Sequence, residues 1–320
     1  MPGLSSIGGH FWSVASAAAY TLSPPRPPRS VPWAAFIEDE RGRPLTVRGA
    51  FSSRPESTRL YILVHGLGGS PESPYMVRAA ADIFDAGHSC LRLAVRGVDP
   101  DGGDLYHAGL THDVHAILGL EELDGFEDIF LVGFSLGGHI AMCAASEGLD
   151  ERVRAVAAVC APVDLEATVT HIDHPLATVY KNYILKSLLQ MHKELAASGR
   201  STAPARRFDS IKSIRDLDAI TVTARFGFDS TSHYYRSQSI AWRFDSVDRP
   251  LLYIGAEHDP VVPARASKPH LEAAPRRWVE VHWSQRGGHV YFPPDLDLGL
   301  SRTPGLNAQM LAWLERHATR

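Results

Sequence analysis

Residues 128–138, DIFLVGFSLGG, combine a buried-strand pattern, a sharp turn and the start of a helix. Asp128–Phe134 is short, apolar and rich in residues that favour β-structure, and Leu136–Glu147 has a helical pattern. Gly133-Phe-Ser-Leu-Gly137 joins them, with glycines where side chains would clash at a close strand–helix crossing. The pattern predicts a strained turn that lifts the Ser135 hydroxyl above the sheet, beside amides at a helix N-terminus.

Further strands and helices alternate on both sides of this turn. We predict strands at Leu60–Val64, Cys90–Val95, Val153–Cys160, Pro250–Gly255 and Trp278–Trp283, and helices at Pro71–Ala86, Tyr106–Leu123 and Asn307–His317. Apolar strands separated by helices favour an α/β fold with a mostly parallel, doubly wound sheet covered on both faces. Before them, Ala35–Ile37 and Leu45–Val47 flank a turn-like segment and predict a β-hairpin.

The alternation is interrupted between the fourth and fifth parallel strands, before the penultimate strand of the chain. Residues 163–245 are mostly helical in pattern, and within Pro175–Ser198 apolar side chains recur at helical spacing: Tyr180, Ile184, Leu188, Met191 and Leu195. We predict a helical lid at 163–245, a core made of 35–162 and 246–320, and an N-terminal extension, 1–34, with a proline-rich, extended connector at 22–32. The apolar row either packs on the core or lines an acyl pocket.

A serine hydroxyl becomes a good nucleophile only when a base takes its proton. His289 follows two glycines after the last strand, and Asp259 follows the penultimate strand. The chain order Ser, Asp, His predicts a triad of Ser135, Asp259 and His289. Asp259 has an alternative role as a turn-capping residue before Pro260. Two other acidic residues are weaker substitutes for the acid, Glu257 and Asp295.

The turn His65-Gly-Leu-Gly-Gly69 follows the first parallel strand. In this geometry it supplies one donor of an oxyanion hole, and we assign the two donors to the backbone N–H groups of Leu67 and Leu136. The alternative is a plain glycine-rich connection. A phosphate-binding turn at Gly133–Gly137 is disfavoured, because the chain has neither a GK[ST] nor a GxGxxG pattern there. We also expect weaker substrate contacts from four residues: His65, Gly66, Tyr234 and Tyr235.

The composition argues against a polyanionic binding partner but leaves most other functions open. The net charge is −4 and no basic run is present, which argues against a nucleic-acid partner. Cys90, Cys143 and Cys160 form no CxxC pair, which predicts buried free thiols and a reducing compartment. Phe11–Tyr20 is apolar, but it has no preceding Lys or Arg and is too short to cross a bilayer. We therefore expect a cytoplasmic protein with no membrane span; the oligomeric state stays open.

Several motifs together resemble the α/β-hydrolase superfamily, and within it the YheT-like esterase branch. They are HGLGGSPESPYM at 65–76, Arg96-Gly97, Tyr106-His-Ala-Gly109, GFSLGGHIA at 133–141, FGFDSTSHYYRSQS at 226–239, HDPVVP at 258–263 and GGHVYF at 287–292. The resemblance extends over about residues 60–292. It implies an α/β-hydrolase fold and a carboxylic-ester hydrolase for short- to medium-chain acyl esters, with no metal and no cofactor. Two features depart from it: the N-terminal GGHFWSVASAAAY, and Gly68 beside the oxyanion turn.

Alternative functions use the same residues. Transfer of the acyl group to an alcohol or thiol needs the same serine, and lipase, lactonase and thioesterase activities stay open. A catalytically inert ligand-binding protein on this fold is a third class. Two histidine groups have residue types that bind metals, His112 with His115 and His171 with Asp173 and His174. Neither has an evident further ligand, so we predict no metal site. His107 and Tyr106 are expected to shape the loop under the active site.

Overall fold

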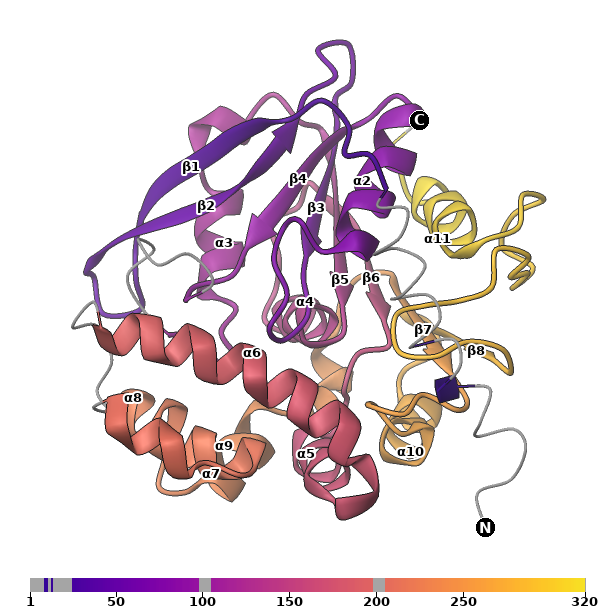
Figure 1. The fold of residues 1–320 in the computed structure, drawn as a ribbon. Helices are drawn as coiled ribbons and strands as arrows, with labels where there is room; N and C mark the ends of the chain where they lie inside the picture. The colour runs from indigo at the N-terminus through magenta and orange to yellow at the C-terminus, as the bar shows by residue number, and fades with distance from the viewer. Residues whose placement is uncertain (1–8, 11–12, 14–24, 98–104, 198–204, 320) are drawn as a thin grey trace.

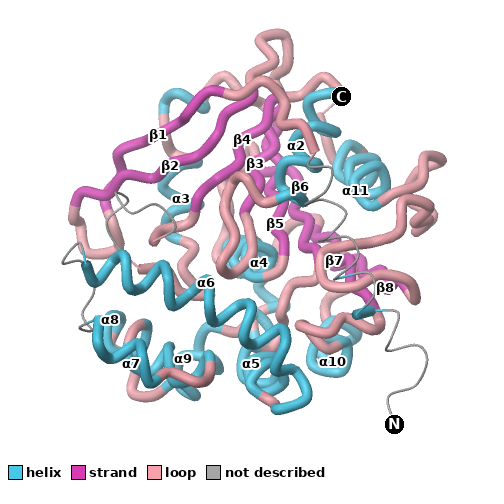
Figure 2. Tube along the Cα trace, viewed as in Figure 1, coloured by secondary structure: helices cyan, strands magenta, loops and turns pink. Residues whose placement is uncertain are grey.

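The structure is a computed structural model that describes residues 9–10, 13, 25–97, 105–197 and 205–319. Within this part of the chain one sheet is formed by eight strands: β1 Val31–Glu38, β2 Pro44–Ser52, β3 Arg59–Val64, β4 Ser89–Ala94, β5 Asp128–Phe134, β6 Val153–Val159, β7 Leu251–Ala256 and β8 Val279–Ser284. Their spatial order is β1-β2-β4-β3-β5-β6-β7-β8. The β1–β2 hairpin is antiparallel and joins β4 in antiparallel register, whereas β4 to β8 are parallel. The predicted mostly parallel sheet and its hairpin are confirmed (Figure 2).

Helices cover both faces of the sheet. They are α2 Pro74–Asp85, α3 His112–Leu118, α4 Leu136–Ser146, α10 Ala264–Ala273 and α11 Leu306–Glu315. Successive side chains of a strand point to opposite faces. In β3, Leu60, Ile62 and Val64 join one core with α3, α4 and α10, while Tyr61 and Leu63 join a second core with α2 and α11. All five are fully buried, which explains the unbroken apolar pattern of the central strands.

Between β6 and β7 the chain leaves the sheet and forms a helical insertion. It contains α5 Leu165–Asp173, α6 Thr178–Ala197, α7 Ile214–Ile220, α8 Val222–Phe226 and α9 Thr231–Gln238, with 3-10 turns at Pro175–Ala177, Ala205–Ser210, Ile240–Trp242 and Phe244–Ser246. In Figure 1 these helices lie together at the lower edge of the view, with α6 crossing in front. Of the predicted apolar row, Leu188 and Leu195 are buried, and Tyr180, Ile184 and Met191 are half-buried.

One helix is shorter than its sequence pattern predicts. The prediction spans Tyr106–Leu123, but α3 begins only at His112, and Glu121–Leu123 is a separate 3-10 turn. The residues before α3 pack against the insertion instead: the Ala108 N–H donates to the Tyr234 hydroxyl (2.8 Å). A Cβ at Gly109 would lie 2.0 Å from the Gln238 side chain. This tertiary contact takes backbone that local propensity assigned to the helix.

The proline-rich connector ends earlier than predicted. Residues 25–30 form neither helix nor strand, but Val31 and Pro32 already begin β1. Pro32 lies in an edge strand, where a missing N–H is tolerated. The rest of the connector, residues 22–24, and most of the apolar Phe11–Tyr20 stretch lie outside the described residues.

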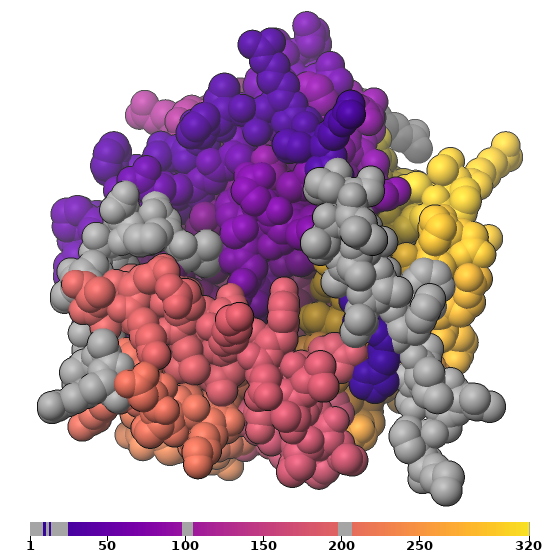
Figure 3. Space-filling view, in the orientation of Figure 1, coloured from indigo at the N-terminus to yellow at the C-terminus, as the bar shows by residue number. Residues whose placement is uncertain are grey.

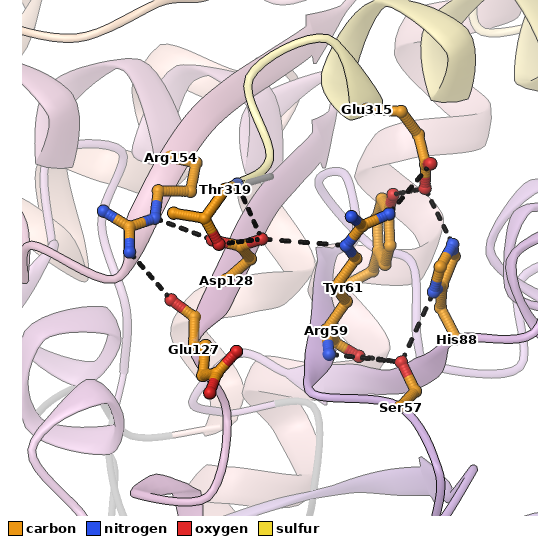
Figure 4. A network of polar contacts seen from close by, with 9 residues as sticks. All are labelled: Ser57, Arg59, Tyr61, His88, Glu127, Asp128, Arg154, Glu315 and Thr319. Atoms are coloured by element: carbon orange, nitrogen blue, oxygen red, sulfur yellow. Dashed lines mark hydrogen bonds and ion pairs between the residues drawn. The ribbon is translucent and has the colours of Figure 1, made fainter.

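A polar network joins α11 and the residues after it to the central strands of the sheet (Figure 4). Asp128, at the start of β5, accepts hydrogen bonds from Arg154 Nε (2.8 Å) and from the backbone and hydroxyl of Thr319 (3.0 and 2.9 Å). Glu315 of α11 accepts from the Tyr61 hydroxyl (2.8 Å) and pairs with Arg59. The network joins the amino-terminal ends of β3 and β5, which are opposite the strand ends where the predicted triad residues follow.

In the part of the chain that the structure describes, no helix combines the length and the apolar character needed to cross a membrane.

Candidate active site

Ser135 occupies the turn between β5 and α4 in a conformation that few residues adopt. Its φ is 52° and its ψ −121°, a region that costs energy for a residue with a side chain. The glycines on either side make the turn possible. A Cβ at Gly133 would lie 2.2 Å from the Gly137 carbonyl oxygen, and one at Gly137 would lie 2.2 Å from the Val64 carbonyl oxygen. The strained backbone presents the hydroxyl at the carboxyl edge of the sheet.

His289 lies between Ser135 and Asp259. Its Nδ1 is 2.9 Å from Asp259 Oδ2, and its Nε2 is 2.9 Å from Ser135 Oγ. An ionised carboxylate only accepts hydrogen bonds, so Nδ1 carries the proton and donates it to Asp259. Nε2 is then an acceptor that faces the serine O–H. This arrangement can take the serine proton and stabilise the imidazolium that results.

Asp259 is held with both oxygens engaged. The N–H groups of Val261 and Val262 donate to Oδ1 (2.8 and 2.9 Å), and the side chain is 2% exposed. The two substitutes weighed for the acid lie elsewhere. Glu257 pairs with Lys268 (2.6 Å), and Asp295 pairs with Arg286 (2.9 Å) on the surface. Among the three acids, only Asp259 contacts the imidazole in the described hydrogen bonds.

The loop that carries His289 has an unusual backbone. Gly287 has a φ of 143°, and Val290 has a φ of 55°, which is strained for a β-branched residue. The Gly288 N–H donates to the Tyr291 carbonyl (2.8 Å), and the Cys160 thiol donates to the Gly288 carbonyl (3.6 Å). The loop therefore depends on contacts from other segments for its shape.

Cys160, Asp259 and His289 are the one group of potential metal ligands gathered within 4.8 Å among the described residues. Burial raises the pKa of the Cys160 thiol well above its ordinary value, which disfavours the thiolate that a metal requires. Asp259 and His289 already bind each other. These residues fit a proton-transfer pair better than a metal centre.

The glycine-rich turn after β3 lies against the serine. A Cβ at Gly66 would be 2.9 Å from the Ser135 Cβ. The Gly66 N–H donates to the hydroxyl of Tyr75 on α2 (3.0 Å). Sequence reasoning did not single out Tyr75, although it lies in the quoted segment 65–76. Among the described backbone hydrogen bonds, none uses the Leu67 N–H, and Leu136, as the first residue of α4, has no intrahelical acceptor. Both amides are thus available to an oxyanion.

His65 lies beneath this turn rather than at its surface. It is 1% exposed, its Nδ1–H donates to the Gly66 carbonyl (2.8 Å), and its Nε2 accepts from the Val95 N–H (3.2 Å). Burial lowers its pKa to about 4. Both ring nitrogens are used by backbone, so the described contacts of His65 support the turn from below.

Tyr234 and Tyr235 are buried inside the insertion. The Tyr234 hydroxyl accepts from Ala108, and the Tyr235 hydroxyl donates to Asp218 (2.6 Å). Tyr234 also packs edge-on against His107, which places His107 in the contact between its loop and the insertion. The described hydrogen bonds and ring contacts of the two tyrosines do not reach Ser135, Asp259 or His289.

The insertion does reach the glycine-rich turn after β3 through α6. The Ser187 hydroxyl donates to the Gly68 carbonyl (3.0 Å). The sequence does not single out Ser187, because most serines on a long helix have no functional role. The contact brings one face of α6 over the edge where Ser135 lies.

The weighed histidine groups do not gather into a metal site within the described residues. His112 Nε2 lies 2.7 Å from the Glu38 carbonyl, and His171 contacts the Pro260 carbonyl and Arg265. Asp173 accepts from the N–H groups of Ile214 and Arg215. Each group is engaged in joining elements of the fold.

Comparison with known proteins places this geometry in a family. Residues 61–293 match the family model described as alpha/beta hydrolase fold. The chain is 30% identical over 238 residues to the Escherichia coli (strain K12) protein named "Putative esterase YheT", covering 72% of this chain and 69% of that protein. It is 22% identical to a Saccharomyces cerevisiae monoacylglycerol lipase, covering 72% of this chain and 54% of that enzyme.

A solved structure agrees at the level of the fold. The alpha/beta hydrolase GrgF from Penicillium sp. sh18 superposes with a TM-score of 0.58 at 17% identity, covering 90% of this chain and 99% of that chain. With the sheet order, the strained serine turn and the sequence match all in agreement, the chain belongs to the α/β-hydrolase fold family and to its YheT-like esterase branch.

Proposed function

We propose that this protein is a serine carboxylic-ester hydrolase that works through an acyl-enzyme on Ser135. The observation that carries the proposal is the hydrogen-bond chain Ser135–His289–Asp259, with both contacts at 2.9 Å. A buried acid, a neutral imidazole of fixed tautomer and a strained serine are the parts that acyl transfer needs. Similarity to proteins named as an esterase and a monoacylglycerol lipase supports an ester substrate.

The reaction proceeds in two halves. His289 Nε2 takes the proton of Ser135 as its Oγ attacks the ester carbonyl carbon, and the negative charge on the carbonyl oxygen is stabilised by the Leu67 and Leu136 N–H groups. The carbon–oxygen ester bond breaks, and His289 gives its proton to the departing alcohol. In the second half, His289 takes a proton from water as the water oxygen attacks the acyl carbon. It then gives that proton to Ser135 Oγ as the bond between the acyl group and the serine breaks, which releases the acid and restores Ser135.

For the substrate, we infer a short- to medium-chain acyl ester, and a lid role for residues 163–245. The support is that α6 lies over the oxyanion turn through the Ser187–Gly68 contact and brings half-buried apolar side chains with it. A small-molecule ester requires no cofactor in this scheme. Transfer of the acyl group to an alcohol instead of water uses the same steps and is tested by adding an alcohol acceptor.

For location, we infer the cytoplasm. The support is that Cys90, Cys143 and Cys160 are all buried and free, as in proteins of reducing compartments. Cell fractionation tests this, and recovery in a secreted or membrane fraction contradicts it.

The test of the function uses Ser135→Ala beside the wild type. A fluorophosphonate probe should label the wild type and not the variant, and ester hydrolysis in the variant should fall by about 10³-fold or more. A panel of p-nitrophenyl esters of increasing acyl length then ranks the substrates. Near-wild-type hydrolysis by Ser135→Ala overturns the assignment, and a wild type that neither labels nor hydrolyses any ester indicates an inert ligand-binding protein.

A further inference from the structure

Residues from the N-terminal extension lie against both loops of the candidate active site. We refer to the described residues Gly9, His10 and Ser13 as the N-terminal brace. In Figure 1 the brace is indigo and lies beside β7 and β8, which are near the other end of the sequence. Figure 3 shows its atoms next to the surface of the insertion. The brace belongs to the part of the chain that departs from the family pattern, so no motif accounts for it.

Ser13 makes the contact that matters for His289. The backbone N–H of His289 donates to Ser13 Oγ (2.9 Å), and the Ser13 hydroxyl donates to the Gly9 carbonyl (2.9 Å). Ser13 is 8% exposed. Removing its oxygen leaves the His289 amide without this acceptor in a mostly buried place, and an unpaired buried N–H is unfavourable.

The brace fits both loops too closely to be a chance contact. A Cβ at Gly9 would lie 1.7 Å from the carbonyl oxygen of His258, the residue before Asp259. A Cβ at Gly288 would lie 2.3 Å from Ser13 Oγ and 2.4 Å from the Gly9 carbonyl oxygen. Backbone therefore meets backbone on the acid side and on the histidine side.

The brace also touches the insertion. His10 Nδ1 lies 2.9 Å from the hydroxyl of Tyr180 on α6, and the two rings stack with centroids 5.4 Å apart. This third contact fixes the brace between α6 and the two loops. A segment held on three sides can transmit its position to the loop it supports.

From these contacts we propose that Ser13 is a positioning residue: it fixes the backbone of His289 so that the imidazole lies in line between Ser135 and Asp259. The proposal rests on the proposed function, because positioning has a consequence only if His289 is the base. The strained backbone of Val290, the residue next to His289, gives the physical need. A loop that is not at its own energy minimum keeps its geometry only when neighbours hold it.

The experiment compares Ser13→Ala, Ser13→Thr and Gly9→Ala in the full chain, with Ser146→Ala as the matched control. Ser146 is a half-buried serine whose hydroxyl, among the described hydrogen bonds, donates to the Cys143 carbonyl at the end of α4, away from His289. For a p-nitrophenyl ester, Ser13→Ala should lower kcat by about tenfold, because small misplacement of a catalytic group is costly. KM should stay within about twofold. Ser13→Thr, which keeps the hydroxyl, should recover most of the rate.

Gly9→Ala should reproduce the loss although Ser13 is intact, because the added methyl displaces the brace. The double variant Gly9→Ala/Ser13→Ala should lose no more than either single variant, since both act through one contact. A proton NMR spectrum supplies the specific readout. The downfield signal of His289 Nδ1–H should weaken or shift in Ser13→Ala and persist in Ser146→Ala.

The outcomes separate the inference from the function. If Ser13→Ala keeps kcat and the downfield signal while Ser135→Ala is inactive, the positioning role is wrong and the function stands. If Ser13→Ala and Ser146→Ala lose activity equally, or if the loss follows a lower unfolding midpoint that Ser13→Thr does not repair, Ser13 is only structural and the proposal fails. If Ser135→Ala remains active, the proposed function itself fails.

Discussion

At the scale of single residues, the site depends on which acid the imidazole meets. Sequence order favoured Asp259 and left Glu257 and Asp295 as substitutes. In the structure Glu257 forms an ion pair with Lys268, and Asp295 forms one with Arg286. Asp259 instead accepts hydrogen bonds from two backbone N–H groups and from His289 Nδ1–H. An acid that is already oriented by backbone can orient the imidazole in turn.

We therefore predict that Asp259→Asn lowers kcat by about 10³- to 10⁴-fold, because an amide can hold the imidazole in the wrong tautomer. The measurement is steady-state hydrolysis of a p-nitrophenyl ester by enzyme of known active-site concentration. Glu257→Gln and Asp295→Asn are the matched controls and should keep kcat within about twofold. Full activity in Asp259→Asn, with loss in either control, would reassign the acid.

At the scale of elements, α6 relates the insertion to the site. Ser187 contacts the glycine-rich turn after β3, and Ile184, three residues earlier, lies on the same face of the helix. Ile184 is only half-buried, so this face is not fully used by packing. Val179 lies on the same helix but is 74% exposed, and it serves as a comparison residue.

We predict that substitutions at Ile184 change the preferred acyl length. Ile184→Phe should shorten it and Ile184→Ala should lengthen it, because each buried CH₂ contributes about 0.8 kcal/mol, or roughly fourfold in kcat/KM. The measurement is kcat/KM across a series of acyl esters, with Val179→Ala as the control. Labelling by a small phosphonate should not change. An unchanged length profile in both Ile184 variants would make this face of α6 structural.

The junction of α11 with the sheet is a second element-scale feature, and it lies away from the chemistry. The Asp128 side chain is 3% exposed and accepts hydrogen bonds from Arg154 and Thr319. Removing its charge weakens hydrogen bonds to a charged group, which are stronger than neutral ones.

We predict that Asp128→Asn lowers the free energy of unfolding by about 1–3 kcal/mol and leaves kcat per folded molecule unchanged. Urea unfolding and active-site titration measure the two quantities. Asp248→Asn is the control, because Asp248 pairs with Arg249 at an exposed position and should change stability little. A drop in kcat without a drop in stability would show that the junction affects the site.

At the scale of the whole molecule, buried histidines make stability depend on pH. Burial lowers the pKa of His65, His107 and His192 from the ordinary value of about 6.5 to about 4 in each case. Between pH 6.5 and 4 the unfolded chain binds protons at these residues that the folded chain does not, so stability falls as pH falls through this window. Asp218 and Asp113 act in the opposite sense, since burial raises the pKa of both carboxyls, that of Asp218 to about 7. Burial also lowers the pKa of His139, so the buried histidines outnumber these two acids.

We predict a loss of about 3 kcal/mol in the free energy of unfolding between pH 7 and pH 5, from about 1.4 kcal/mol per pKa unit. Urea unfolding at the two pH values measures it. His192 stacks on Phe208, so His192→Phe removes one titrating group and should reduce the pH dependence by about a third or more. His233→Gln, at an exposed position, should leave it unchanged. Equal stability at pH 5 and pH 7 would contradict the burial of these rings as neutral groups.

Much of the fold followed from local pattern. The strands β3 to β8 lie within a residue or two of their predicted bounds. For β3 to β7 the reason is that a strand buried on both faces must be apolar along its whole length. The Gly133–Gly137 turn was also predictable. Only glycines fit there, because a Cβ at either position would lie 2.2 Å from a backbone carbonyl oxygen. The predicted roles of Ser135, Asp259 and His289 came from chain order, which parallel strands convert into proximity at one edge of the sheet.

Other features were decided only by tertiary structure. Residues 106–111 are not helical as predicted, because this segment packs on the insertion, where the Ala108 N–H donates to the hydroxyl of Tyr234, 126 residues away. The Tyr75 hydroxyl reaches the Gly66 N–H from α2, nine residues along the chain, and the Ser13 hydroxyl reaches the His289 N–H from 276 residues away. A lone hydroxyl has no periodic signature in sequence; its role depends on which distant backbone group lies within hydrogen-bond distance once the chain has folded.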